Sequence, residues 1–280
     1  MTTLAEPRPD LAAEPGPLPG TRWSGARTAG SRWGAGALGI VVVLAVWTLA
    51  GVFQWFRGTI PTPVAVLRAI GEQGGDFYAT NVTPTVELAL RGFLWGNGLA
   101  IAIALLVVLI PAVEGLATQL AIISYCTPLI AVAPIIQVAF SEVQTMIVFL
   151  AAISVFFTTM IGVLSGLRSP NAAELDLVRV YGGGPFAQLV RVRIVSALPN
   201  TLAALKIAAP AAVLGAVLGE FLSMPEQGIG PSMILAQQQA AIPQVWAIAL
   251  IAGVVAGVGY AIVAVIARFV DRWARGEAIR

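Results

Sequence analysis

Histidine is absent from this chain of 280 residues, and cysteine occurs once, at Cys126. Without histidine there is no imidazole to act as a general base or to bind a transition metal, and one cysteine cannot form a disulfide within the chain. The sequence also lacks a GxxxxGK[ST] loop, whose backbone amides would hold the phosphates of ATP. We therefore expect no catalytic site, no metal site and no cofactor bound by this chain.

Charged residues are scarce as well, at 11%, whereas apolar residues make up 58% and the mean hydropathy is +0.87. A soluble core cannot absorb that much apolar surface, so the composition indicates a membrane protein with several spans. A span needs about 20 mainly apolar residues to cross the hydrocarbon. Six segments qualify, and the third and fourth are separated by only SEVQ, which predicts a tight helical hairpin. The predicted spans are residues 37–56, 84–110, 117–140, 143–167, 200–223 and 244–268.

Basic residues gather at one set of span ends, which predicts the orientation. With both termini in the cytoplasm, Arg57, Arg68 and Arg91 fall on or near the outer side. The arginines then placed on the cytoplasmic side are Arg8, Arg22, Arg27, Arg32, Arg168, Arg179, Arg191, Arg193, Arg268, Arg272, Arg275 and Arg280. The net charge of +2 is therefore explained by topology and carries no indication of nucleic-acid binding.

The N-terminal residues 1–35 are rich in proline, glycine and alanine and have no periodic apolar face, which predicts a disordered cytoplasmic tail. A cleaved signal peptide is disfavoured because the first apolar run starts late and is long enough to span. The transmembrane domain is expected over residues 36–275, with a short cytoplasmic tail at 276–280.

One polar stretch interrupts the apolar chain at residues 174–199, ELDLVRVYGGGPFAQLVRVRIVSALP. Residues 175–181 can form a short helix, and GGGP at 182–185 must end it because glycine permits positive φ and proline lacks an amide donor. A second short helix is expected over 186–195, with Pro199 starting the fifth span. The result is a helix–turn–helix that either rests on lipid headgroups or docks on a partner.

This stretch resembles the "EAA" coupling loop of binding-protein-dependent ABC importer permeases. In that pattern a Glu-Ala-Ala triplet is followed four residues later by glycine and then by an apolar-x-Leu-Pro element. Here Asp176, Leu177 and Val178 occupy the triplet and Gly182 keeps the glycine, whereas Val195 replaces the first proline of the last element, which SALP follows.

Further segments are similar to the nitrate/sulfonate/taurine-type branch of that family, in order and at matching spacings over residues 38–275. They are TIPTPVAVLRAI (59–70), PLIAVAP (128–134), TMIGVLSGLRS (159–169) and GEFLSMPEQGIGPSMI (219–234). The resemblance implies an all-α membrane protein with six transmembrane helices, N-in/C-in, in the type I ABC importer permease (MetI-like) fold of the bacterial inner membrane.

The same resemblance implies the partners. Two cytoplasmic ATPase subunits would bind ATP and Mg and hydrolyse the ATP, a solute-binding protein outside the membrane would deliver the cargo, and a second permease copy, most simply a homodimer, would complete the pathway. The coupling loop, about residues 170–198, would dock on the ATPase. The residues assigned to that contact are Leu175, Asp176, Leu177, Val178, Arg179, Tyr181, Gly182 and Arg191.

Candidate pathway residues lie in the spans. Pro128 and Pro134 remove helical hydrogen bonds, which fits either a bend lining the pathway or a packing kink. Glu220, near the outer end of the fifth span, would either face an outer gate or be solvated by water. Glu87 and Arg91 are spaced for a local ion pair.

The cargo is expected to be a small anion of the nitrate, sulfonate or taurine kind, or a vitamin precursor. The alternative function is a stand-alone secondary transporter. That alternative would predict inverted repeats and charged residues at mid-membrane, and the sequence shows no convincing repeat.

Overall fold

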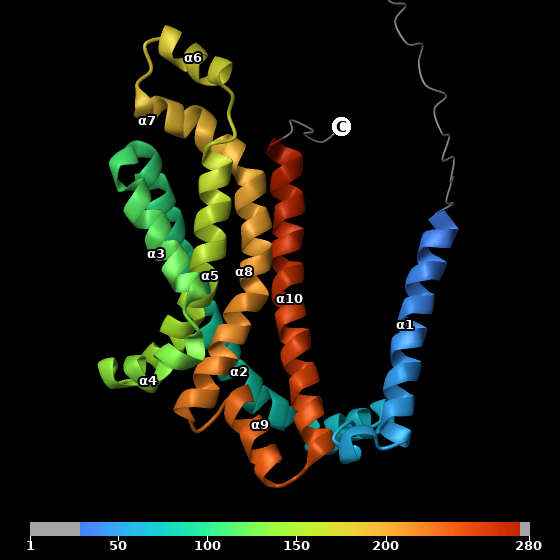
Figure 1. Ribbon diagram of the computed structural model, residues 1–280. Helices are drawn as coiled ribbons and strands as arrows, with labels where there is room; N and C mark the ends of the chain where they lie inside the picture. The colour runs from blue at the N-terminus through green and yellow to red at the C-terminus, as the bar shows by residue number, and fades with distance from the viewer. Residues whose placement is uncertain (1–28, 275–280) are drawn as a thin grey trace, which may run out of the picture. The chain divides into compact units, whose positions relative to one another are not determined.

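The computed structural model describes residues 29–274 and is helical there, without a strand in that range (Figure 1). The chain divides into two compact units, residues 1–46 and 47–280. The described part of the first unit belongs to one apolar helix, α1 (Ala29–Val52). This helix begins inside the stretch predicted to be a disordered tail, because a helix nucleated in an apolar run extends with one further hydrogen bond per residue. Residues 1–28 and 275–280 lie outside the described part.

The second unit contains the rest of the chain's described helices. They are the 3₁₀ turn η1 (Trp55–Gly58), α2 (Pro63–Leu109), the 3₁₀ turn η2 (Pro111–Val113), α3 (Glu114–Cys126), α4 (Leu129–Ala139), α5 (Val143–Leu167), α6 (Ala172–Val180), α7 (Pro185–Gln188), the π-helical turn η3 (Leu189–Arg193), α8 (Ile194–Ser223), α9 (Ile229–Gln238) and α10 (Ile242–Ala274).

Among the described residues, four helical segments are long and apolar enough to cross a membrane: Pro63–Leu109, Val143–Leu167, Pro185–Ser223 and Ile242–Val270. The predicted third span is corrected, because α3 and α4 meet at an angle of 105°. Thr127 is extended there, with ψ 118°, since the ring of Pro128 disfavours a helical residue before it and offers no amide hydrogen. A continuous 117–140 helix paired with α5 is therefore wrong, and the segment is one broken span or a re-entrant pair.

The predicted start of the fifth span is also corrected. Pro199 lies inside α8, and the helical chain runs on from Pro185 through the π-helical turn. Packing holds the helix through this proline, since Gly166 of α5 approaches Ala197 so closely that an added Cβ would lie 2.9 Å from its Cα. Tertiary contact here outweighs the helix-breaking tendency of proline.

Helix α5 is the centre of the second unit and packs against α8 and α2. Small residues allow these close approaches. A Cβ added to Gly96 of α2 would lie 2.4 Å from the carbonyl oxygen of Ala152, and one added to Gly215 of α8 would lie 2.8 Å from the Cα of Ala151. The core therefore depends on backbone proximity as much as on large side chains.

The two ends of this unit differ in what they carry (Figure 1). Helices α6 and α7 lie at the end where α10 finishes, whereas α9 lies at the opposite end, where α10 begins. We call these the loop end and the α9 end. At the loop end, the guanidinium of Arg168 forms an ion pair of 2.5 Å with Glu114, which joins the α2–α3 turn to the foot of α5.

Candidate functional site

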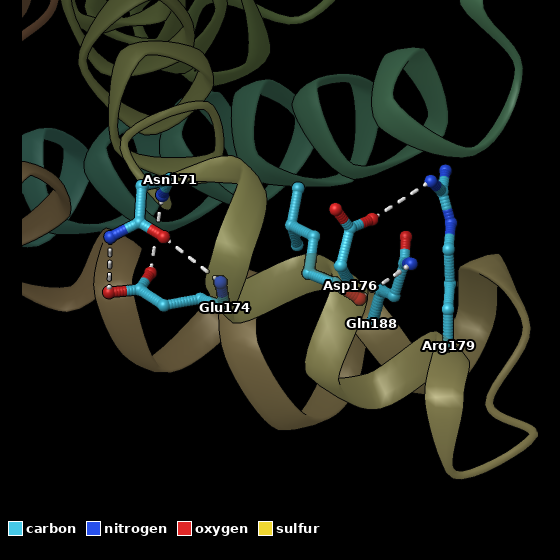
Figure 2. Close-up of polar contacts among 6 residues, drawn as sticks. Asn171, Glu174, Asp176, Arg179 and Gln188 are labelled. Atoms are coloured by element: carbon cyan, nitrogen blue, oxygen red, sulfur yellow. Dashed lines mark hydrogen bonds and ion pairs between the residues drawn. The ribbon is translucent and has the colours of Figure 1, made fainter.

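The polar stretch forms two short helices at the loop end, and the first of them, α6, has a fully capped N-terminus (Figure 2). The side-chain oxygen of Asn171 accepts from the amide of Glu174 at 2.9 Å, and the carboxylate of Glu174 accepts from the amide of Asn171 at 3.3 Å. This reciprocal capping box satisfies amides that a helix otherwise leaves unpaired. Helix α6 therefore begins at a defined residue although none of its side chains is buried.

The C-terminus of α6 ends in a Schellman motif that the glycines make possible. Gly182 has a φ of 79°, and its amide donates to the carbonyl of Arg179 at 2.8 Å. The amide of Gly183 donates to the carbonyl of Val178 at 2.8 Å. Glycine adopts this left-handed conformation without the clash that a Cβ brings, so the predicted break falls where the turn needs it.

The second helix is held against the first by a side chain. Pro185 stands at the first position of α7, where its missing amide hydrogen costs nothing. Gln188 is buried and donates from its amide to the carbonyl of Leu175 at 3.1 Å, a bond visible in Figure 2. Arg193 donates to the carbonyl of Leu167 at 3.1 Å, which ties the far end of the stretch to α5. The two short helices thus form a folded projection fixed to the transmembrane helices.

An exposed apolar surface runs along α6. Leu177, Val180 and Tyr181 are three and four residues apart, so they share one side of the helix, and they are 60%, 82% and 82% exposed. We call these three residues the apolar face. Phe186, on α7, adds a further ring that is 69% exposed. The apolar face lies outside the four segments long enough to cross a membrane, and an exposed apolar surface there is typical of one that contacts another molecule.

The apolar residues that the sequence assigns to the ATPase contact differ in their exposure. Leu177 and Tyr181 point outward, whereas Leu175 and Val178 are half-buried on the side toward α7. Val180 and Phe186 were missed, although the spacing of Val180 from Leu177 and the aromatic residue directly after GGGP were signals that could have identified them.

Most charged residues of the stretch are exposed, and Arg193 is half-buried. Asp176 and Arg179 form an ion pair with each other at 3.2 Å, drawn in Figure 2, and Arg191 is exposed on the π-helical turn. An exposed pair of this kind contributes little to folding stability. Asp176 and Arg179 are therefore free to exchange this contact for one with a partner at small cost.

The two prolines of the third predicted span have different positions. Pro128 stands at the break between α3 and α4, and Pro134 lies inside α4; both are exposed. The structure thus assigns the sharp bend to Pro128 and not to Pro134.

Glu220 is completely buried within the described part of the chain, so its carboxylate is paired with protein groups and is not at the surface. Its two oxygens accept from the hydroxyl of Thr85 at 2.6 Å and from the amide of Gly230 at 2.8 Å. Thr85 in turn accepts from the amide of Ile229 at 3.0 Å. The carboxylate therefore joins α2, α8 and the N-terminus of α9, where the helix dipole favours negative charge.

The ion pair predicted between Glu87 and Arg91 is confirmed, at 2.5 Å on the exposed side of α2. Among the described residues, no group of three histidine, cysteine, aspartate or glutamate side chains is arranged to hold a metal ion.

Comparison with known families shows what the chain is similar to. Residues 96–276 match the family described as binding-protein-dependent transport system inner membrane component. The match covers α3 to α10, including α6, α7 and the buried Glu220.

Individual relatives agree with this match. The chain is 27% identical to a probable ABC transporter permease protein of Haemophilus influenzae, over 75% of this chain and 85% of the relative. It is 26% identical to a putative aliphatic sulfonates transport permease protein of Bacillus subtilis, over 86% and 88%. It is also 26% identical to a formylaminopyrimidine transport permease protein of Halalkalibacterium halodurans, over 68% and 76%.

Proposed function

Because the chain belongs to the family of binding-protein-dependent transport system inner membrane components, the ABC transporter permeases, we propose that it is the membrane-spanning subunit of an ATP-driven importer. Its cargo is a small solute delivered by a separate binding protein on the outer side. Two copies of the chain form the pathway, and two ATPase subunits, which bind the ATP and Mg, drive it from the cytoplasm.

The exposed apolar face of α6 is the observation that supports this proposal. Leu177, Val180 and Tyr181 are outside the spans and have no partner within the described part of the chain that buries them. Aromatic and aliphatic side chains that become buried in a pocket supply most of the binding energy of a protein interface. We propose that these side chains enter a groove of the ATPase.

The rigidity of the projection gives the contact a mechanical consequence. The capping box, the Schellman motif and the bond from Gln188 fix α6 on α7, and α7 continues into α8. A movement of the ATPase is then transmitted to α8 as a rigid-body displacement, and this displacement opens the pathway to one side and then to the other.

Co-purification of the ATPase tests the proposal. The double substitution Leu177→Ala and Tyr181→Ala removes two anchors without opening a core, and we expect at least a tenfold loss of bound ATPase, since hot-spot truncations cost roughly 2 kcal/mol or more each. ATP-dependent uptake into membrane vesicles should fall in parallel.

Leu235 provides a matched control for this experiment. It is 54% exposed on α9, at the opposite end of the second unit, so Leu235→Ala removes a similar apolar side chain far from α6. ATPase bound equally by the double variant and by Leu235→Ala would contradict the assignment. Uptake that persists after ATP depletion, with ion gradients intact, would instead support the secondary-transporter alternative.

A further inference from the structure

A groove of 450 Å³ follows the seam between α5 and α8 in the half of the membrane segment nearer the loop end. It is a shallow groove that opens on the surface of the chain. The polar side chains along it are Thr158 and Ser165 from α5 and Asn200 from α8, and the aromatic rings of Tyr125 and Phe157 line it as well.

The groove exists because small residues bring the two helices together beneath it. A Cβ added to Gly162 would lie 2.5 Å from the Cβ of Ala204. Gly162 and Ala204 both line the groove, and because they have little or no side chain the groove is bounded there by backbone. Its longer polar and aromatic side chains lie around this floor. This arrangement leaves room for a flat molecule.

The polar side chains of the groove lack protein partners. Within residues 29–274, the side chains of Thr158, Ser165 and Asn200 make no hydrogen bond to another group of the chain. By contrast, Asn81 and Asn97 on α2 each return their amide to the carbonyl four residues earlier, at 2.9 and 2.7 Å. The exposed amide of Asn200 is therefore available to bond a ligand.

The aromatic pair offers one free ring face. Tyr125 stacks on Phe157 with ring centroids 4.5 Å apart and an angle of 26°, and Tyr125 is 69% exposed. One face of the tyrosine ring is therefore occupied and the other is open to a planar ligand, which stacking favours.

Charge is missing from the lining of the groove. Lys206 of α8 is not among the lining residues, and Arg168, three residues beyond Ser165, is paired with Glu114. A sulfonate or nitrate that entered the groove would lose hydration without gaining a cationic partner, which is costly at low dielectric. A neutral solute pays no such penalty.

We propose that this groove contacts the transported solute and that the solute is a neutral, planar molecule with a hydrogen-bonding edge, such as a nitrogen heterocycle, and not a small anion. Tyr125 stacks on the plane of the ring, while Asn200, Ser165 and Thr158 bond its edge. The inference rests on the proposed importer function and selects between the cargoes that the names of two relatives indicate, a formylaminopyrimidine and aliphatic sulfonates.

Ligand-detected saturation-transfer NMR on the full chain in nanodiscs tests this, with cytosine and ethanesulfonate as the two probes. Cytosine is expected to give a transfer signal and ethanesulfonate none. Asn200→Ala should weaken cytosine binding about fivefold or more through the lost hydrogen bonds, and Tyr125→Ala similarly through the lost stacking. Tyr125→Phe should retain most of the signal, because it keeps the ring.

Thr201→Ala is the matched control, since Thr201 is the next residue of α8 and does not line the groove. Binding of ethanesulfonate equal to or tighter than that of cytosine overturns the proposal, as does the absence of cytosine binding or an unchanged signal in both the Asn200→Ala and the Tyr125→Ala variant. Tyr125→Ala remains informative if Asn200→Ala fails to fold, because the ring of Tyr125 is mostly exposed. The binding test needs the permease alone, so its failure is distinct from a failure to co-purify the ATPase.

Discussion

Glu220 shows how protein groups satisfy a carboxyl group inside a span. Its oxygens bond to Thr85 and to the amide of Gly230, and Gly228, with φ 148°, passes so close that an added Cβ would lie 2.7 Å from the carboxyl carbon. Thr85, Gly228 and Gly230 therefore enclose the carboxylate of Glu220. A structural role in positioning α9 follows from this geometry.

We predict that Glu220→Ala is strongly destabilising. The amide of Gly230 would lose its acceptor inside the protein, and a buried polar group left unpaired costs about 1–3 kcal/mol, whereas the hydroxyl of Thr85 would keep the carbonyl of Asn81 at 3.2 Å. Glu220→Gln should cost less, because its oxygen still accepts from one of them. The measurement is the midpoint of thermal unfolding in detergent, followed by tryptophan fluorescence.

Glu87→Ala serves as the control for this prediction. Its carboxylate is exposed and pairs with Arg91 on the surface of α2, so its loss should cost less than about 1 kcal/mol. Equal midpoints for Glu220→Ala and Glu87→Ala would show that the buried carboxylate does not hold α9.

At the scale of elements, the three glycines of the GGGP turn are under different steric and backbone constraints. Gly182 needs a positive φ, but an added Cβ would have open space around it. A Cβ on Gly183 would lie 2.5 Å from the Val178 side chain and 2.8 Å from the carbonyl oxygen of Val178. Gly184 has neither constraint. Three identical substitutions therefore probe three different physical conditions.

We expect Gly183→Ala to disrupt the turn most, Gly182→Ala to cost about 1 kcal/mol from the left-handed backbone, and Gly184→Ala to be nearly neutral. The rate of hydrogen exchange of the α6 amides should increase most in Gly183→Ala, less in Gly182→Ala and least in Gly184→Ala. The loss of bound ATPase should follow the same ranking. A Gly184→Ala variant as damaging as Gly183→Ala would contradict this ordering.

Much of this element was predictable from the sequence, and the reason is local. The glycines, Pro185 and the Asn171–Glu174 spacing act within a few residues, so the helix–turn–helix follows from the chain itself. The direction of the side chains was not predictable, because it depends on Gln188 bonding Leu175 across the turn. For the same reason Leu175 was assigned to the partner contact although it is half-buried, whereas the exposure of Val180 and Phe186 was signalled by local spacing.

For the whole molecule, the loop end and the α9 end should lie on opposite sides of the membrane. The basic residues Arg168, Arg179, Arg191 and Arg193 are at the loop end, which the positive-inside rule assigns to the cytoplasm. Arg57 precedes α2, whose first residues lie toward the α9 end (Figure 1).

Cysteine labelling checks this orientation. In a Cys126→Ser background the chain has no thiol, and single cysteines are placed at two exposed positions, Ala173 of α6 and Gln239 after α9. In intact cells, spheroplasted where an outer membrane is present, a membrane-impermeant maleimide should label Gln239→Cys and should label Ala173→Cys only after permeabilisation. Labelling of both before permeabilisation would contradict a transmembrane separation of the two ends.

The sequence by itself predicted the membrane class from hydropathy and the helix–turn–helix from turn chemistry, because both are local properties of the chain, and its motifs indicated the family by resemblance. Tertiary structure decided that α8 continues through Pro199 and that Glu220 joins Thr85 of α2 to the N-terminus of α9, whereas the bend at Pro128 has a local cause and only its size of 105° came from the structure. These outcomes depend on close contacts between segments, such as that of Gly166 with Ala197 and that of Gly228 with Glu220. The contacts of Gly166 with Ala197 and of Glu220 with Thr85 join residues far apart in the chain, so no local pattern predicts them.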